Sequence, residues 1–300
     1  MQHSGRISGA TKLIGLIGSP VQNSGSPAIH NAVFEHLDLD IAYIAFDVDN
    51  TRLEATVRGM AAMGFLGYNV TTPCKTFILP FLDEISEVAE IMGAVNTVVI
   101  QDGKSLGDNA DGAAFIRNLV LNGIDIRGKK ITVIGAGGAG SALITQAALD
   151  GVAEIDLFNR QDEFYTGAEE LIERLKSHSS CNVTLYDLAD EAQLRSSIAG
   201  SALLVNATNV GTPEVPGCLV TQDMLHEGLI MADTVYVPRD TQFVELGRAN
   251  GNKVIDGSGM FLQQAAIGER LWIGREMPLD FVKSTFFPDT PNPLVELLKS

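Results

Sequence analysis

Hydrophobic residues along this 300-residue chain form short apolar runs that alternate with longer amphipathic stretches. Apolar or β-branched runs bounded by Gly, Pro, Asn or Asp predict strands, and apolar residues spaced three or four apart predict helices. Up to residue 121, the pattern predicts strands at 13–18, 41–48, 65–70 and 93–100, and helices at 26–37, 51–63, 83–92 and 111–121. Beyond it, the pattern predicts strands at 131–134, 154–158, 183–186, 202–206, 229–235 and 254–255, and helices at 141–149, 162–177, 191–198 and 241–250. From residue 257 the pattern is helical as far as 298.

Strands and helices alternate through both halves, which is typical of α/β proteins with parallel sheets and right-handed crossovers. The length suits two domains of about 150 residues each. We predict a first domain at residues 1–114, completed by 257–300, and a second domain at 115–256. The C-terminal helical segment should pack back on the first domain, which leaves a cleft between the domains.

Two local signals mark helix starts in the first domain. Ser26 precedes Pro27, which suits an N-cap followed by proline at the first helical position. Thr51 and Glu54 have the spacing of a capping box. Both predictions concern side-chain hydrogen bonds at the N-terminal ends of helices.

The clearest motif for ligand binding follows the β-branched run Ile131–Ile134 and reads G-A-G-G-A-G at 135–140. In a G-x-G-x-x-G turn, the first glycine permits the sharp bend, the second admits a pyrophosphate, and the third lets helix and strand pack closely. The N–H groups at the start of the next helix would attract the phosphates. A tight turn that binds nothing is the alternative. The flanking strands and helix favour a Rossmann-type NAD(P)-binding domain.

Composition limits the classes of binding partner that we expect for this chain. The net charge is −16, from 37 acidic and 21 basic residues, which argues against nucleic acid or an anionic membrane as the main partner. Three cysteines show no disulfide or zinc pattern, so no metal is expected. Because the start of the chain lacks a signal peptide's apolar core and no apolar run approaches ~18 residues, we expect a soluble cytoplasmic protein.

Lys75 and Asp111 are the two residues best placed for proton chemistry. Lys75 follows a predicted strand in a Thr/Pro-rich loop, and ligands of open α/β sheets gather at the carboxyl ends of strands. It could hold an anion or move a proton, or it could be an ordinary surface lysine. Asp111 begins a predicted helix, where it could be an N-cap, or could orient a substrate hydroxyl and pair with Lys75.

Other polar residues suit ligand contacts. Ser24 and Ser26 precede a helix, where hydroxyls suit a carboxylate ligand. Asn96, if buried, must hydrogen-bond to backbone or ligand. Asp162 lies just beyond the second strand of the Rossmann pattern and would favour NAD through the ribose hydroxyls. Arg160 beside it would instead favour the 2′-phosphate of NADP. No His stands in a hydrolase or zinc arrangement, and His30 is expected to pack or cap.

These motifs, in their order and spacing, resemble the shikimate dehydrogenase family over about residues 13–274. The matching segments are Ser24–Pro27 with His30–Asn31, Asn69–Lys75, Gly93–Thr97, Asn109–Asp111, the glycine loop, Asn206–Thr208, Asp233 with Tyr236 and Pro238, Asp256–Met260 and Gln264. The resemblance implies a reversible reduction of 3-dehydroshikimate to shikimate, or the same chemistry on 3-dehydroquinate and quinate. Hydride would pass to or from nicotinamide, with Lys75 and Asp111 as the catalytic pair.

The resemblance also implies the binding residues. Those for the cyclic hydroxy acid are Ser24, Ser26, Thr71, Asn96, Tyr236 and Gln264. Those for the cofactor are Gly135, Ala136, Gly137, Gly138, Ala139, Asn159, Arg160, Asp162, Thr208, Val235 and Gly257. Asn159–Asp162 looks like the quinate/shikimate branch of the family, which implies that NAD is preferred, with NADP as the other candidate cofactor. A homodimer is the oligomer we expect.

The chain departs from the family pattern beside the catalytic aspartate. Ala110 replaces the usual Thr, and Ala114 replaces a usual Gly. Asn23 and Thr212 also stand where His and Met are usual, and Asn209 stands where the quinate-accepting branch tends to have Lys. A dehydrogenase for a different cyclic polyol acid is therefore one alternative. A non-catalytic ligand sensor is another, although the retained Lys75 and Asp111 speak against it.

Overall fold

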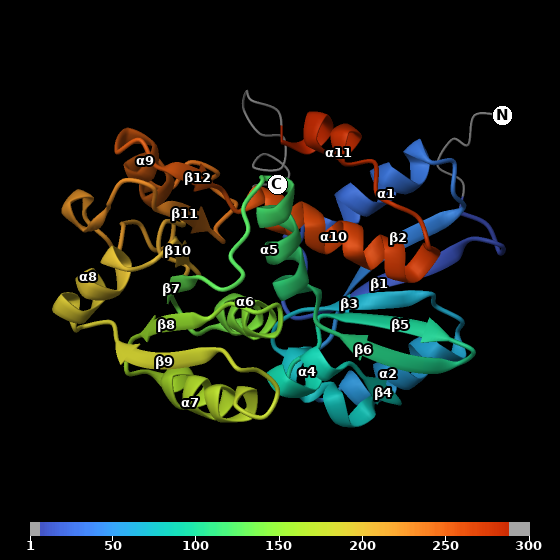
Figure 1. Ribbon diagram of the computed structural model, residues 1–300. Coiled ribbons are helices and arrows are strands. Elements are labelled where there is room, and N and C mark those ends of the chain that lie inside the picture. Colours follow the sequence, from blue (N-terminus) through green and yellow to red (C-terminus); the bar gives the residue numbers. More distant parts are fainter. Residues whose placement is uncertain (1–6, 288–300) are drawn as a thin grey trace. The chain divides into compact units, whose positions relative to one another are not determined.

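The computed structural model describes residues 7–287, which contain two compact units, each built on a six-stranded sheet (Figure 1). One unit runs to Ala110 and takes up the chain again at Gln264, and the other is Asp111–Gln263. The divisions fall near the expected 114/115 and 256/257 boundaries. Helices pack on both sheets, which confirms the predicted α/β class.

The first unit is a mixed sheet with short helices around it. Its strands, in the spatial order β2-β1-β3-β5-β6-β4, are β1 (Lys12–Gly18), β2 (Ile41–Asp47), β3 (Gly67–Val70), β4 (Glu84–Ile85), β5 (Thr97–Gln101) and β6 (Lys104–Asp108). Its helices are α1 (Ser26–His36), α2 (Leu53–Ala62), α3 (Cys74–Phe77), the 3-10 turn η1 (Leu79–Phe81), α4 (Glu87–Met92) and α11 (Leu279–Phe286), with part of α10 (Ser258–Ile273).

The prediction of an all-parallel sheet is wrong for this unit. Strand β5 runs antiparallel to both β3 and β6. Asp102 and Gly103 form a two-residue connection between β5 and β6 with φ values of 52° and 77°. Positive φ at both central residues is typical of a tight β-hairpin, which reverses the chain. The start of β5 therefore lies at the same sheet edge as the end of β3.

Two predicted helix starts are also wrong. The helix predicted at 83–92 begins only at Glu87, capped by Ser86, and the residues before it form β4 against β6. The capping box at Thr51 does not form, because the Asp49 carboxylate binds the Thr51 backbone N–H and hydroxyl at 2.9 and 2.5 Å. The Thr51 hydroxyl, which would have capped the helix, is thus bound in a local Asx turn.

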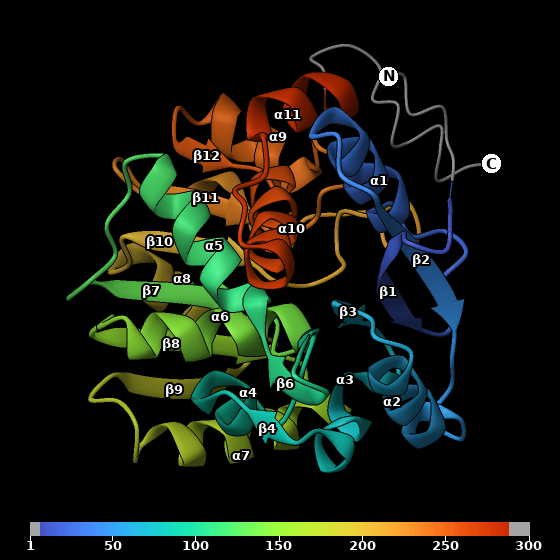
Figure 2. The same ribbon diagram turned by 90° about the vertical axis from the view of Figure 1, so that its right-hand side faces the viewer.

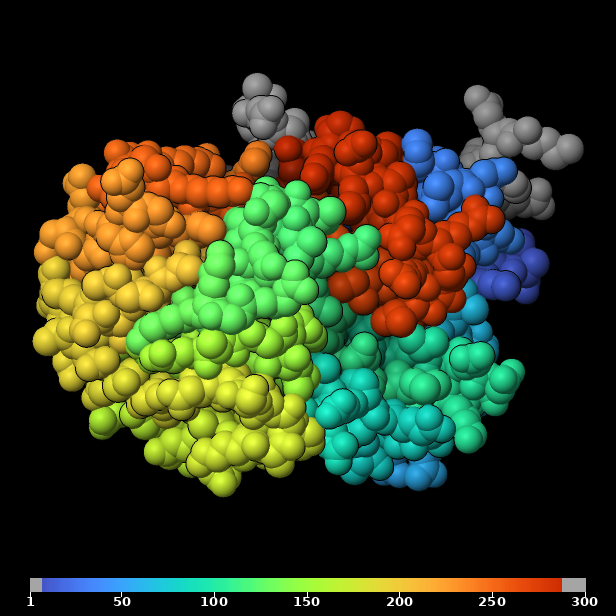
Figure 3. All heavy atoms as spheres, in the orientation of Figure 1, coloured from blue at the N-terminus to red at the C-terminus, as the bar shows by residue number. Residues whose placement is uncertain are grey.

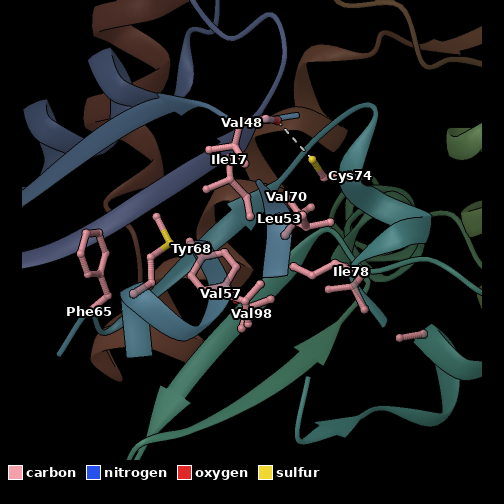
Figure 4. Close-up of a cluster of buried hydrophobic side chains, with 13 residues drawn as sticks. Ile17, Val48, Leu53, Val57, Phe65, Tyr68, Val70, Cys74, Ile78 and Val98 are labelled. Carbon is pink, nitrogen blue, oxygen red and sulfur yellow. Dashed lines mark hydrogen bonds between the residues drawn. The ribbon is translucent and has the colours of Figure 1, made fainter. Parts of the chain in front are cut away.

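Two hydrophobic clusters cover the two faces of this sheet. One joins Tyr68 and Val98 of the sheet to Leu53 and Val57 of α2, and the Cys74 thiol donates to the Val48 carbonyl at 3.3 Å (Figure 4). The cluster on α1 and α10 is built from Ile14, Leu16, Val21, Phe34, Tyr43 and Trp272. Both faces are buried, as the continuous apolar strand runs predict.

The C-terminal segment packs on the first unit, as predicted. Trp272 of α10 donates its indole N–H to the Val98 carbonyl of β5 at 2.9 Å. Phe281 of α11 stacks on His36 of α1, with ring centroids 4.1 Å apart, and Figure 3 shows the red C-terminal atoms beside the blue atoms of α1. The continuous helix predicted from 257 is interrupted between α10 and α11, where Gly274 has φ of 66°. Residues 288–298 of that prediction lie outside the described part.

The second unit is a parallel sheet of the Rossmann type. Its strands, in the order β12-β11-β10-β7-β8-β9, are β7 (Lys130–Ile134), β8 (Glu154–Asn159), β9 (Asn182–Asp187), β10 (Leu203–Asn206), β11 (Ile230–Asp233) and β12 (Lys253–Ile255), seen stacked in Figure 2. Its helices are α5 (Ala110–Leu121, from Asp111), α6 (Gly138–Leu149), α7 (Glu163–Leu175), α8 (Glu191–Ala199), the 3-10 turn η2 (Gln222–Met224), α9 (Gln242–Ala249) and the start of α10. All its strand pairs are parallel, as predicted.

Candidate active site

Backbone hydrogen bonds gather several predicted site segments at one edge of the first sheet. Ser19, which follows β1, donates its N–H to the Thr72 carbonyl at 2.9 Å. Val95 donates to the carbonyl of Lys75 at 2.8 Å, and Asn96 donates to that of Asp108 at 3.0 Å. The carboxyl ends of β1, β3 and β6 therefore meet the start of β5. This edge carries the serine loop, the Thr71–Lys75 loop and Asn96.

Asn96 is the most informative residue of this edge. Its side chain is 2% exposed, and its Oδ1 accepts the Thr97 hydroxyl and the Ala110 N–H, both at 2.9 Å. With both acceptor sites of Oδ1 used, the amide orientation is determined. Its Nδ2 is buried and has no hydrogen-bond partner among the described residues. A buried donor without a partner is costly, so it marks a place where a ligand atom can accept a hydrogen bond.

Lys75 and Asp111 follow strands of this sheet along the chain. Lys75 is half-buried on α3, where Val95 binds its carbonyl. Helix α5 begins at Ala110, one residue earlier than predicted, so Asp111 lies in the first helical turn and is not the N-cap. Thr71 is half-buried after β3, and its N–H donates to the Ile17 carbonyl at 2.9 Å.

The predicted N-cap role of Ser26 is wrong. Gly25 is the N-cap of α1, with φ −76° and ψ −13°, and Ser26 is the first helical residue. Because the chain is already helical at Gly25, no side chain caps this end. The Ser26 N–H instead donates to Ser24 Oγ at 3.3 Å, and both serines are half-buried. The Ser26 hydroxyl is therefore not used for capping.

The glycines of the loop at 135–140 in the second unit have two different roles. Gly135 has φ of 108°, and a Cβ at Gly140 would lie 2.0 Å from the Gly135 carbonyl oxygen, so the fold itself requires these two glycines. A Cβ at Gly137 or Gly138 would meet no protein atom within 4 Å. Gly137 is the N-cap of α6, and no side chain caps that end. The uncapped N–H groups and the open space above Gly137 fit a phosphate group.

The acidic residue beyond β8 is held in place by its neighbours. The Asn159 amide accepts the Ala136 N–H at 3.0 Å and donates to Asp162 Oδ1 at 2.9 Å. Asp162 also caps α7 by accepting the Phe164 N–H. Arg160 lies 3.5 Å from Asp162 Oδ2, with side-chain exposures of 78% and 29%. The two residues with opposite implications for the cofactor therefore form an ion pair with each other.

The remaining predicted cofactor residues follow the ends of the central strands. The Thr208 hydroxyl, just past β10, donates to Asn206 Oδ1 at 2.7 Å. Val235 follows β11, and a Cβ at Gly257 would lie 2.3 Å from its carbonyl oxygen. Ala139 is half-buried on α6 beside these loops. Because the strands are parallel, these positions share the sheet edge of Gly135.

Two predicted substrate residues belong to the segment between β11 and α11. Tyr236 stacks on Phe261 with ring centroids 4.6 Å apart, and burial raises the pKa of Tyr236. Gln264 is half-buried on α10. Ala110 and Ala114, which depart from the family pattern, are 1% and 0% exposed.

Sequence reasoning assigned no role to Asn69, which the structure connects to Asn96. Its Nδ2 donates to the Asn96 carbonyl at 3.2 Å and to the Thr97 hydroxyl at 3.3 Å. A single amide inside the apolar run 65–70 was the available signal, because a buried polar group must find partners.

Among residues 7–287, no cluster of three potential metal-binding side chains occurs, and no helix is long and apolar enough to span a bilayer.

A Rossmann unit with this glycine loop, joined to an α/β unit with a polar sheet edge, defines the class of nicotinamide-dependent dehydrogenases. A family model described as the shikimate dehydrogenase substrate binding domain matches residues 16–98. The curated shikimate dehydrogenase (NADP(+)) of Listeria monocytogenes serotype 4b is 45% identical over 94% of this chain and 98% of its own length. The chain belongs to the shikimate dehydrogenase family.

Solved structures agree with this membership. A crystal structure of shikimate 5-dehydrogenase from Listeria monocytogenes in complex with shikimate and NAD has a TM-score of 0.91 at 45% identity, covering 93% of this chain and 97% of that one. Quinate dehydrogenase from Corynebacterium glutamicum in complex with NAD has a TM-score of 0.82 at 29% identity, covering 91% and 98%. The curated relative is named for NADP(+), whereas both structures hold NAD.

Proposed function

We propose that this chain catalyses the reversible, nicotinamide-dependent oxidation of shikimate to 3-dehydroshikimate, with quinate as a second substrate. The observation that carries the proposal is the buried Asn96 amide, whose Nδ2 has no partner among the described residues. It lies at the sheet edge that also carries the serine loop and the Lys75 loop. A ring bearing several hydroxyls and one carboxylate offers acceptors for such donors.

Each polar group has a proposed task. The Ser24 and Ser26 hydroxyls contact the carboxylate, away from the reacting carbon, and the Asn96 amide donates to a ring hydroxyl. Thr71, Tyr236 and Gln264 complete the contacts to the ring. This arrangement of neutral donors is suited to an anion in a protein whose net charge is −16, because the binding groups must then be local.

Lys75 and Asp111 are proposed to handle the proton of the hydroxyl that is oxidised. Lys75 takes that proton, or stabilises the developing negative charge on the oxygen. Asp111 orients the lysine and an adjacent hydroxyl. Nicotinamide supplies the hydride chemistry when it is bound. The role left to the protein is orientation, which the backbone hydrogen bonds between the loops at the ends of β3, β5 and β6 support.

The residues of the second unit fit a dinucleotide, and NAD is the preferred form in our proposal. Gly137 and the uncapped start of α6 would receive the pyrophosphate. Asp162 Oδ2 would accept ribose hydroxyls and repel a 2′-phosphate. Arg160, the residue that would favour NADP, lies within 3.5 Å of this carboxylate, which reduces its positive charge toward a phosphate.

A second candidate is a dehydrogenase for a different cyclic polyol acid. The observation in its favour is that Ala110 and Ala114, both buried, replace the Thr and Gly that the family usually has. Ala110 also donates its N–H to Asn96, so a change at this position adjoins a proposed substrate contact.

One kinetic matrix tests both candidates. Initial rates are measured with shikimate and quinate, each with NAD and NADP. The proposal predicts turnover of at least one acid and a higher kcat/KM with NAD. Rates indistinguishable from background with both acids, on a folded sample that binds NAD, would refute shikimate and quinate as substrates and favour the second candidate.

A further inference from the structure

Tyr43 of β2 is hydrogen-bonded to Asn69, the residue whose amide binds the backbone of Asn96. Its side chain is buried, and its hydroxyl donates to Asn69 Oδ1 at 2.7 Å. Burial raises the pKa of Tyr43, so the phenol keeps its hydrogen. The hydroxyl thus joins β2 to Asn69 of β3.

From Asn69 the hydrogen bonds continue to Asn96. Asn69 Nδ2 donates to the Thr97 hydroxyl at 3.3 Å, and that hydroxyl donates to Asn96 Oδ1 at 2.9 Å. The Asn69 amide cannot turn over without placing its Oδ1 against the Asn96 carbonyl oxygen, so Oδ1 is the atom that accepts the Tyr43 hydroxyl. The Ala110 N–H fixes the Asn96 amide with Nδ2 as a donor that has no partner among the described residues, and the bonds through Asn69 and Thr97 connect Tyr43 to its Oδ1.

The Tyr43 ring is held rigidly. His30 of α1 stacks on it with ring centroids 4.5 Å apart and an interplanar angle of 16°. The His30 ring is fixed in turn by Glu269 of α10, whose Oε1 lies 2.9 Å from Nδ1, and by the edge of Trp272 at 5.6 Å. The His30 and Glu269 side chains are 1% and 0% exposed, so the residues that hold the Tyr43 ring are themselves fully buried.

We propose that Tyr43 is a positioning residue for the cyclic hydroxy acid, acting through Asn69 and Thr97 on Asn96. This inference rests on the proposed function. The phenol does not touch the substrate. It supports the position of the Asn96 amide by holding Asn69, whose Nδ2 bonds both the Asn96 carbonyl and the Thr97 hydroxyl. Removing only its oxygen should leave the packing intact and loosen the Asn96 contact with the ligand.

The test compares two single-oxygen deletions in strands of the same sheet. Tyr43→Phe removes the hydroxyl that begins the chain of bonds. Tyr68→Phe is the matched control, because Tyr68 is 0% exposed in β3 and its hydroxyl has no hydrogen-bond partner in the described part of the chain. For wild type and both variants, Tm, the KM for shikimate, the KM for NAD, kcat, and the Kd for shikimate are measured.

We expect Tyr43→Phe to raise the shikimate KM and Kd about tenfold, the scale of one or two lost hydrogen bonds, with the NAD KM within about twofold of wild type. Tyr68→Phe should match wild type in every constant. An unchanged shikimate KM in Tyr43→Phe, or an equal rise in both KM values, would overturn the assignment. So would the same rise in Tyr68→Phe. Wild-type protein that neither binds nor oxidises shikimate or quinate refutes the proposed function, and this assignment with it.

Discussion

Gly137 provides the sharpest test of the cofactor loop, because the fold does not need a glycine there. Its φ of −68° and ψ of −172° are available to alanine, and a Cβ would meet no protein atom within 4 Å. Gly137→Ala gains about 0.4–1 kcal/mol from a less flexible unfolded chain. It loses a similar amount at the N-cap, where glycine is preferred over alanine. The free energy of unfolding should therefore change by less than about 0.5 kcal/mol.

NAD binding should respond much more strongly. A methyl group at Gly137 would stand where the pyrophosphate must approach the backbone, and would remove at least one charge-assisted hydrogen bond. Such a bond contributes about 1.5–3 kcal/mol, which corresponds to a ten- to hundredfold rise in the NAD Kd. The Kd is measured by calorimetric titration, and Tm is measured on the same samples.

Two control variants accompany Gly137→Ala, one expected to destabilise the fold and one expected to change neither stability nor NAD binding. Gly140→Ala would place a Cβ 2.0 Å from the Gly135 carbonyl oxygen, so it should lose about 3 kcal/mol of stability, or roughly 6–12 °C in Tm. Gly167→Ala, on the exposed face of α7, should change neither the Kd nor the fold. A wild-type NAD Kd in Gly137→Ala would refute the reasoning, as would a large loss of stability in that variant.

Four further substitutions test the proposed site. Lys75→Met keeps much of the aliphatic length and should lower kcat by about a hundredfold or more with NAD affinity unchanged, whereas near-normal kcat in a folded sample would remove Lys75 from the mechanism. Ser24→Ala and Ser26→Ala should raise the shikimate KM more than they lower kcat, and a large kcat loss at constant KM would contradict a role in carboxylate binding. Asp162→Asn preserves a good N-cap for α7 but removes the charge, so the NAD-to-NADP ratio of kcat/KM should fall about tenfold. An unchanged ratio would show that Asp162 does not select the cofactor.

The alternation of apolar runs and turn residues was sufficient to predict the second unit. All six of its strands lie within about two residues of their predicted positions. In this unit the four central strands are buried and all strand pairs are parallel, so strand identity depends on local composition, and the helical crossovers follow from the spacing between strands. The close packing at Gly140 was likewise predictable, because a G-x-G-x-x-G loop has one geometry between a strand and a helix.

Only the tertiary structure decided that β5 pairs antiparallel with β3, and which groups hydrogen-bond at the candidate site. The hairpin at Asp102 and Gly103 places Asn96 at the sheet edge where β3 ends. There the Ala110 N–H binds the Asn96 side chain, and the Asn69 amide binds its backbone carbonyl. These partners lie 14 and 27 residues away in the chain. Tyr43, in an apolar strand, has the sequence signature of an ordinary core residue. Its role depends on which polar groups the fold brings to its hydroxyl. Because Tyr43 and Asn69 are both buried away from solvent, their polar groups are satisfied by bonding with each other.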